Sequence, residues 1–73
     1  MREFKTSTID NQTGMEMVLS ECSYNMACDW LERKGFTKYN YLEVCGTETI
    51  LEFTAPKKRT FIYDEERGIL LGD

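Results

Sequence analysis

The sequence contains no histidine, and its three cysteines, Cys22, Cys28 and Cys45, are an odd number without Cys-x-x-Cys spacing. A structural zinc site needs four ligands, usually cysteine or histidine, so this chain alone cannot build the usual one. Histidine is also the common base that activates a serine or cysteine nucleophile. We therefore expect no bound metal, no cofactor and no enzymatic activity. Cys28 and Cys45 are expected to be small buried hydrophobic residues.

Long apolar runs are absent as well. No stretch approaches the length that a membrane-spanning helix needs, so we expect no contact with a membrane. The first residues, MREFKTST, are polar and lack the apolar core of a secretory signal. The expected location is the cytoplasm.

A surplus of positive charge is also missing. The formal net charge is −4, with four basic and six acidic residues in 1–37 and five basic and seven acidic residues in 38–73. Each half therefore carries −2, and the sequence has no basic segment that would attract nucleic acid or an anionic lipid surface over a long range. Nucleic acid is an unfavoured partner.

What is present is the composition of a globular domain. Hydrophobic residues make up 41% of the chain and charged residues 30%. A single proline and five glycines argue against disorder. We expect one α+β domain over residues 1–73. Its stability should be marginal, because a chain of this size buries only about 60% of the surface that its unfolded form exposes.

Residues 20–35, SECSYNMACDWLERKG, are the one stretch with helical periodicity. Its apolar residues recur at the spacing i, i+3, i+4, i+7, at Tyr24, Ala27, Cys28 and Leu31. Ser20 and Ser23 both suit the N-cap of a helix, and Gly35 suits its C-terminal end.

Alternating or β-branched residues predict six strands around this helix. The strands are expected at residues 2–9, 15–19, 38–45, 48–55, 59–63 and 69–71. Short turns between successive strands favour an antiparallel sheet, and the link through the helix should cross over that sheet. We predict a two-layer α+β fold of order ββαββββ, in which one helix packs on an antiparallel sheet of four to six strands.

The third strand predicts the candidate binding face. Leu42 and Val44 should face the helix, because they pack there without leaving a polar group unpaired. The alternate positions should then lie on the open face, together with two glutamates of the next strand. Tyrosine offers a large contact area at low entropy cost, and carboxylates steer a basic partner. The candidate protein-binding residues of this face are Tyr39, Tyr41, Glu43, Glu48 and Glu52.

A second candidate patch lies on the flank of the helix. Met26 and Trp30 are four residues apart and should be neighbours on the helix surface, outside the narrow apolar stripe. Trp30 is either a residue at the edge of the core or an anchor for a protein partner, since tryptophan and methionine are enriched at interfaces. Leu31, Leu51 and Phe53 are expected to meet in the core.

These features favour a small non-enzymatic module that binds a protein with a basic surface. In size and charge it is similar to small acidic inhibitors carried by viruses, so one hypothesis is an inhibitor of a nucleic-acid-handling host complex. The alternative is a module that binds single-stranded nucleic acid through Lys57, Lys58 and Arg59 and the sheet aromatics Phe61 and Tyr63. Dimerisation through a sheet edge, such as the polar first strand, is a further open alternative.

Overall fold

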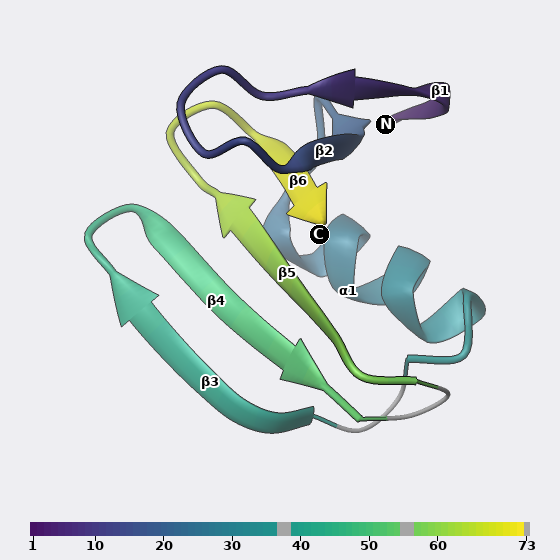
Figure 1. Cartoon of the computed structure of the whole chain (residues 1–73), viewed down its shortest axis with the longest axis vertical. Coiled ribbons are helices and arrows are strands. Elements are labelled where there is room, and N and C mark those ends of the chain that lie inside the picture. The colour runs from purple at the N-terminus through teal and green to yellow at the C-terminus, as the bar shows by residue number, and fades with distance from the viewer. Residues whose placement is uncertain (37–38, 55–56, 73) are drawn as a thin grey trace.

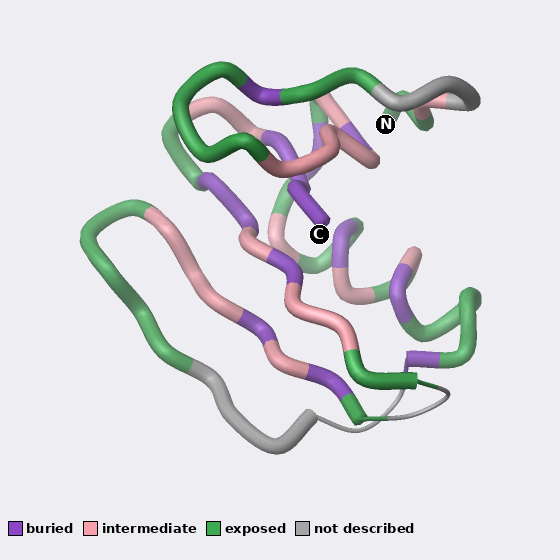
Figure 2. The backbone as a smooth tube through the Cα atoms, viewed as in Figure 1, coloured by how far each residue is buried: buried purple, intermediate pink, exposed green. Residues whose placement is uncertain are grey.

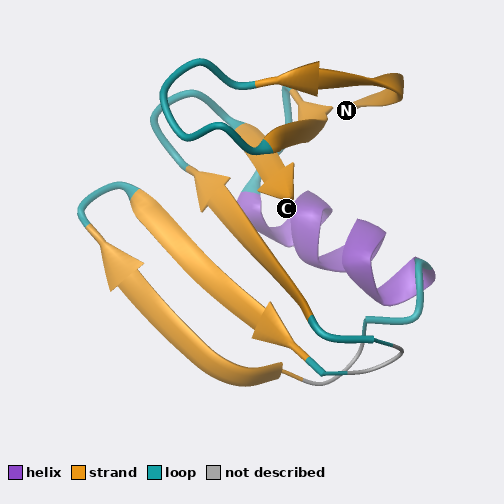
Figure 3. Ribbon diagram, viewed as in Figure 1, coloured by secondary structure: helices purple, strands orange, loops and turns teal. Residues whose placement is uncertain are grey.

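The computed structural model describes residues 1–36, 39–54 and 57–72, with side chains described for 1–4, 8–36, 43–54 and 57–72. That part of the chain contains one helix, α1 (Tyr24–Arg33), and six strands (Figure 3). The strands are β1 (Arg2–Ile9), β2 (Glu16–Ser20), β3 (Tyr39–Cys45), β4 (Glu48–Phe53), β5 (Arg59–Asp64) and β6 (Ile69–Gly72). The predicted α+β layout, a helix with an antiparallel sheet, is confirmed. None of the described helical residues forms a helix of the length and apolar character that crossing a membrane requires.

The spatial order of the sheet is β1-β2-β6-β5-β4-β3, and every neighbouring pair is antiparallel. Most neighbours are consecutive in the chain, but β6 pairs with both β5 and β2. Figure 1 shows β6 between the β1–β2 hairpin and the group formed by β3, β4 and β5. All four residues of β6 are buried, as suits a strand in the middle of a sheet. The link from β2 through α1 to β3 crosses to the far edge of the sheet.

Local contacts explain where α1 begins and ends. Of the two candidate N-caps the helix uses Ser23, whose Oγ accepts a hydrogen bond from the backbone N–H of Met26 at 3.3 Å. Ser20 instead ends β2. At the other end Gly35 has a φ of 94°, which lets the Phe36 N–H reach back to the Leu31 carbonyl at 2.9 Å.

The core lies between α1 and the sheet. Ala27 and Leu31 are the buried helix residues, and Leu31 is only 1% exposed. As predicted, Leu31 belongs to the same hydrophobic cluster as Leu51 and Phe53. Buried positions alternate with half-buried ones over residues 50–53 of β4 and 60–63 of β5 (Figure 2).

An aromatic group closes one end of this core. The rings of Phe36, Phe53 and Phe61 meet edge to face, with centroids 5.2 to 5.9 Å apart. The guanidinium of Arg59 lies 4.8 Å from the centroid of the Phe61 ring. Arg59 therefore lies on the same side of the sheet as the core.

Three sequence-based placements need correction. Val44 is 67% exposed, although its alternation with Leu42 predicted a core position. Cys45 is exposed and Cys28 is only half-buried. Val44 and Cys45 are exposed because their strand, β3, is at the edge of the sheet. The described core residues lie on α1, β2, β4, β5, β6 and the segments flanking α1. The side chain of Leu42 lies outside the described residues.

Arg67 joins two loops at one end of the sheet. Its guanidinium donates to Asp10 at 2.7 Å and to Asp64 at 2.8 Å, which connects the β1–β2 loop to the β5–β6 turn. The hydrogen bond from Arg67 lowers the pKa of Asp10 from 3.8 to about 2, outweighing the burial that would raise it. Burial also acts to raise the pKa of Asp64, but hydrogen bonds from Arg67 leave that pKa below its ordinary value.

Candidate protein-binding surface

The face of the sheet opposite α1 is defined by the strand register, because residues directly opposite in antiparallel neighbours lie on one face. Phe61 and Tyr63 belong to the core beneath α1, so Ile62 between them lies on the opposite face. Successive register partners of Ile62 extend a row across the sheet. From β3 to β2 this row is Glu43, Ile50, Ile62, Leu71 and Met17.

Four of its five residues are apolar, and we call Ile50, Ile62, Leu71 and Met17 the apolar row. Leu71 is fully buried, whereas Ile50, Ile62 and Met17 are half-buried and retain accessible surface. Ile50, Ile62 and Met17 therefore keep apolar surface that can contact another molecule, whereas Leu71 does not.

Carboxylates border the apolar row on the β3–β4 side, and we call Glu43, Glu48 and Glu52 the acidic rim. Glu43 is exposed, and the other two are half-buried. Glu48 and Glu52 flank Ile50 along β4, and Glu43 lies opposite Ile50 on β3. Within the described ranges no ion pair engages any of the three. Among the residues whose side chains are described, no cation therefore compensates their charge.

The register brings together the three glutamates that the sequence analysis named, but that analysis missed the apolar row beside them. A signal for Ile62 was present, since Phe61 and Tyr63 can share one face only if Ile62 takes the other. Local alternation could not show that Leu71 lies beside Ile62 and Met17, because this depends on β6 pairing with β5 and β2.

The two candidate tyrosines do not continue one alternating series. The backbone register places Tyr41 opposite Glu52 but Tyr39 opposite Phe53, with an irregularity between them. Their side chains lie outside the described residues. The three glutamates are therefore the members of the predicted face that the structure brings together.

The helix flank is only partly open. Trp30 is half-buried against the core, and its indole N–H donates to Glu3 Oε1 at 2.8 Å. The ammonium of Lys34 lies 5.4 Å from its ring centroid. The sequence left Trp30 as either a residue at the edge of the core or an anchor for a partner. These contacts are those of a residue at the edge of the core. Met26, by contrast, is 46% exposed.

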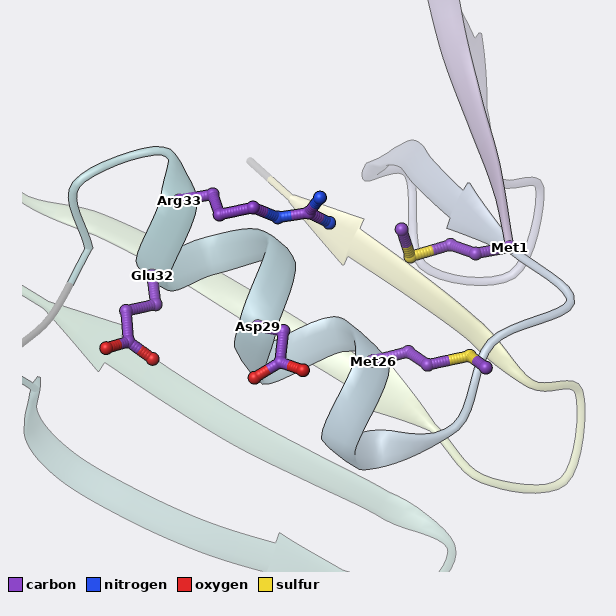
Figure 4. A pocket seen from close by; sticks show the side chains of 5 residues that line it. All are labelled: Met1, Met26, Asp29, Glu32 and Arg33. Atoms are coloured by element: carbon purple, nitrogen blue, oxygen red, sulfur yellow. The ribbon is translucent and has the colours of Figure 1, made fainter.

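Met26 and Trp30 line different depressions. The larger one is open, with a volume of about 470 Å³, and Figure 4 shows four of its side chains on successive turns of α1, with Met1 beside them. Its lining residues are Met1, Met26, Asp29, Glu32 and Arg33. The smaller one, about 130 Å³, is lined by Glu3, Trp30, Arg33 and Lys34. Both contain charges of both signs, unlike the acidic rim.

The residues of the nucleic-acid alternative are separated by the sheet. Lys57 and Lys58 are exposed, but Phe61 is 1% exposed, and the Tyr63 hydroxyl donates to the Cys22 carbonyl at 2.8 Å inside the core. Neither aromatic ring is accessible for stacking on a base. Arg59 packs over Phe61 instead of extending beside the two lysines.

No group of three or more cysteines and carboxylates is placed to hold a metal ion among the residues whose side chains are described. The Cys22 thiol donates to the Gly68 carbonyl at 3.5 Å, and burial raises its pKa, which disfavours the thiolate. No protein-family model matches this chain, and no curated protein or solved structure matches it either.

Proposed function

We propose that this protein is a non-enzymatic binding module whose acidic rim and apolar row dock on a basic surface of another protein. The observation that carries the proposal is the acidic rim itself. Glu43, Glu48 and Glu52 surround accessible apolar surface and have no compensating cation among the described residues.

The two parts of this surface have different roles. Contact with a partner would remove the apolar surface of Ile50 and Ile62 from water, which favours association. The carboxylates raise the association rate with a positively charged partner and disfavour acidic ones. A complementary partner has lysine or arginine around an apolar centre. A protein groove that normally holds nucleic-acid phosphates offers such a surface, so inhibition by occupying that groove is the mode we favour.

Charge reversal on two different faces tests the proposal. Immobilised wild-type protein is compared with Glu43→Lys/Glu52→Lys and with a matched control, Asp29→Lys/Glu32→Lys, which makes the same charge change on exposed positions of α1. Proteins retained from a host lysate are identified by mass spectrometry. Each is then purified and titrated against all three proteins at low and high salt, after circular dichroism has shown that the variants are folded.

The expected result is a partner with a basic surface that binds wild type and the α1 variant but not the rim variant. Its affinity should fall as salt rises, since exposed charges are screened over about 8 Å at 0.15 M ionic strength. Loss of binding in the α1 variant alone would transfer the function to the helix flank around Met26. Equal binding of all three proteins would contradict both assignments.

A further inference from the structure

The sheet has two terminal strands, β1 and β3, and they differ in how their outer edges are protected. A terminal strand presents backbone N–H and C=O groups that have no partner strand in the sheet. Such an edge binds water or accepts another strand, and proteins usually prevent unwanted pairing with charges, proline or irregular backbone.

β1 carries several of these protective features. Its pairing with β2 is irregular between Glu3 and Thr8. Its sequence, REFKTSTI, includes Arg2, Glu3 and Lys5. Glu3 is also held by the indole N–H of Trp30. A second strand would meet an irregular and charged edge here.

β3 has fewer of these features, because its one register irregularity lies at its start, between Tyr39 and Tyr41. Its sequence, YNYLEVC, contains one charged residue, Glu43, and neither lysine nor proline. Its register with β4 is regular from Tyr41 to Cys45. Val44 is 67% exposed, the largest value among the exposed large hydrophobic residues of the described chain. Over Tyr41–Cys45, β3 therefore presents a regular edge that carries one charged residue, Glu43.

We infer that two copies of this chain pair through their β3 edges in antiparallel orientation, which joins their sheets into one. A second copy is the occupant because the edge is complementary to itself. A two-fold axis through Leu42 places each Glu43 opposite Tyr41 of the other copy, within the regular part of the strand. An axis through Glu43 would place the two glutamates directly opposite, which is unfavourable. A basic peptide would find little charge on this edge and is better matched by the acidic rim.

The symmetry has a consequence for the two faces. A two-fold axis perpendicular to the sheet keeps equivalent faces on the same side, so both acidic rims point the same way. Dimerisation through β3 therefore leaves the surface of the proposed function accessible. The inference does not rest on that function, because it follows from the strand edge alone. The interface is small, so dimerisation should depend on concentration.

Light scattering after size-exclusion chromatography tests the inference on three proteins over a range of concentrations. Wild type should shift from the mass of one chain to twice that mass. Val44→Lys, which places a lysine on the β3 edge at an exposed position, should remain a monomer. Thr8→Lys, the matched change at an exposed position of β1, should dimerise as wild type does. Circular dichroism and thermal melting establish that both variants are folded.

A wild type that stays monomeric at every concentration would overturn the inference, and so would a Val44→Lys variant that dimerises normally. Dimerisation lost in Thr8→Lys alone would assign the interface to β1. The register is tested separately by Glu43→Gln, with Glu48→Gln as its control. In the proposed register both variants dimerise equally. Stronger dimerisation of Glu43→Gln alone would show that the glutamates face one another and that the Leu42 axis is wrong.

Discussion

Arg67 Nη1 lies 2.7 Å from Asp10 Oδ1, and this ion pair connects two loops that are 57 residues apart in the chain. Asp10 is almost fully buried, and its carboxylate also accepts hydrogen bonds from the backbone N–H and the hydroxyl of Thr13, each at 3.0 Å. The β1–β2 loop is thus fixed to the β5–β6 turn by a charge that has little access to water.

Replacing Arg67 with methionine should lower the melting temperature substantially, because Asp10 and Asp64 would lose their shared cation while remaining buried. Arg33→Met makes the same chemical change at an exposed site and is the control. Differential scanning calorimetry of both variants measures the effect. Equal melting temperatures for the two variants would show that the Asp10–Arg67 pair does not stabilise the fold.

Asp10 should make stability depend on pH in the acid range. Its pKa is lowered from 3.8 to about 2 in the folded protein, so the unfolded chain binds the proton more readily. The stabilisation is fully present above about pH 4 and is lost as the pH falls towards about 2. Urea unfolding of wild type and Asp10→Asn should therefore show a stability difference that shrinks on acidification. A difference that stays constant from neutral pH to pH 2 would contradict the lowered pKa.

Leu31 should be among the most costly positions to truncate. It is 1% exposed and lies in the cluster that includes Leu51 and Phe53. Leu31→Ala should reduce the free energy of unfolding by about 2–5 kcal/mol, a large share of the stability of a small domain. Val44→Ala, at an exposed position, should change it little. Denaturant titration with tryptophan fluorescence measures both values, and similar losses for the two variants would disprove the assigned core.

Gly72 leaves room for an aromatic ring. A Cβ atom at this position would lie 2.9 Å from Cε1 of Phe61, whose ring is held edge to face by Phe36 and Phe53. Gly72→Ala should therefore cost about 1–3 kcal/mol through overpacking. The penalty should be smaller in a Phe61→Leu background, because the side chain that clashes is smaller. A double-mutant cycle without coupling would show that the clash is absent.

Generic single-stranded nucleic acid should not bind at physiological salt. The chain has a net charge of −4, and Phe61 and Tyr63 are buried in the core. Fluorescence anisotropy with a labelled oligonucleotide at about 0.15 M salt tests this expectation. Micromolar binding that disappears in Lys57→Ala/Lys58→Ala/Arg59→Ala would instead favour the nucleic-acid alternative.

Local patterns were sufficient to predict the helix, the strand positions and the shared face of Glu48, Ile50 and Glu52. Each depends on neighbouring residues, such as Ser23 as the N-cap or the alternation of Glu48, Ile50 and Glu52 along β4. The core position of Leu31 followed from the same kind of periodicity.

Features that depend on distant parts of the chain were not predictable in this way. The exposure of Val44 depends on β3 being the terminal strand, which alternation cannot indicate. The Asp10–Arg67 pair and the Leu71–Met17 part of the apolar row depend on how β6 and its preceding turn pack against the β1–β2 hairpin. The hydrogen bond from the Trp30 indole to Glu3 was not predictable either, because Glu3 lies on β1, far from α1 in the chain.

The central position of β6 has a consequence for the order of folding. The β1–β2 hairpin and the β3–β4–β5 group can each form from contacts that are local in sequence, but β6 must pair with β2 across nearly the whole chain. Contacts of such high sequence separation slow folding, because loop closure precedes the stabilisation that they provide. Joining the two halves through β6 should thus limit the folding rate. Stopped-flow measurements on Leu19→Ala, where β2 meets Leu70, should then show slower folding in addition to faster unfolding.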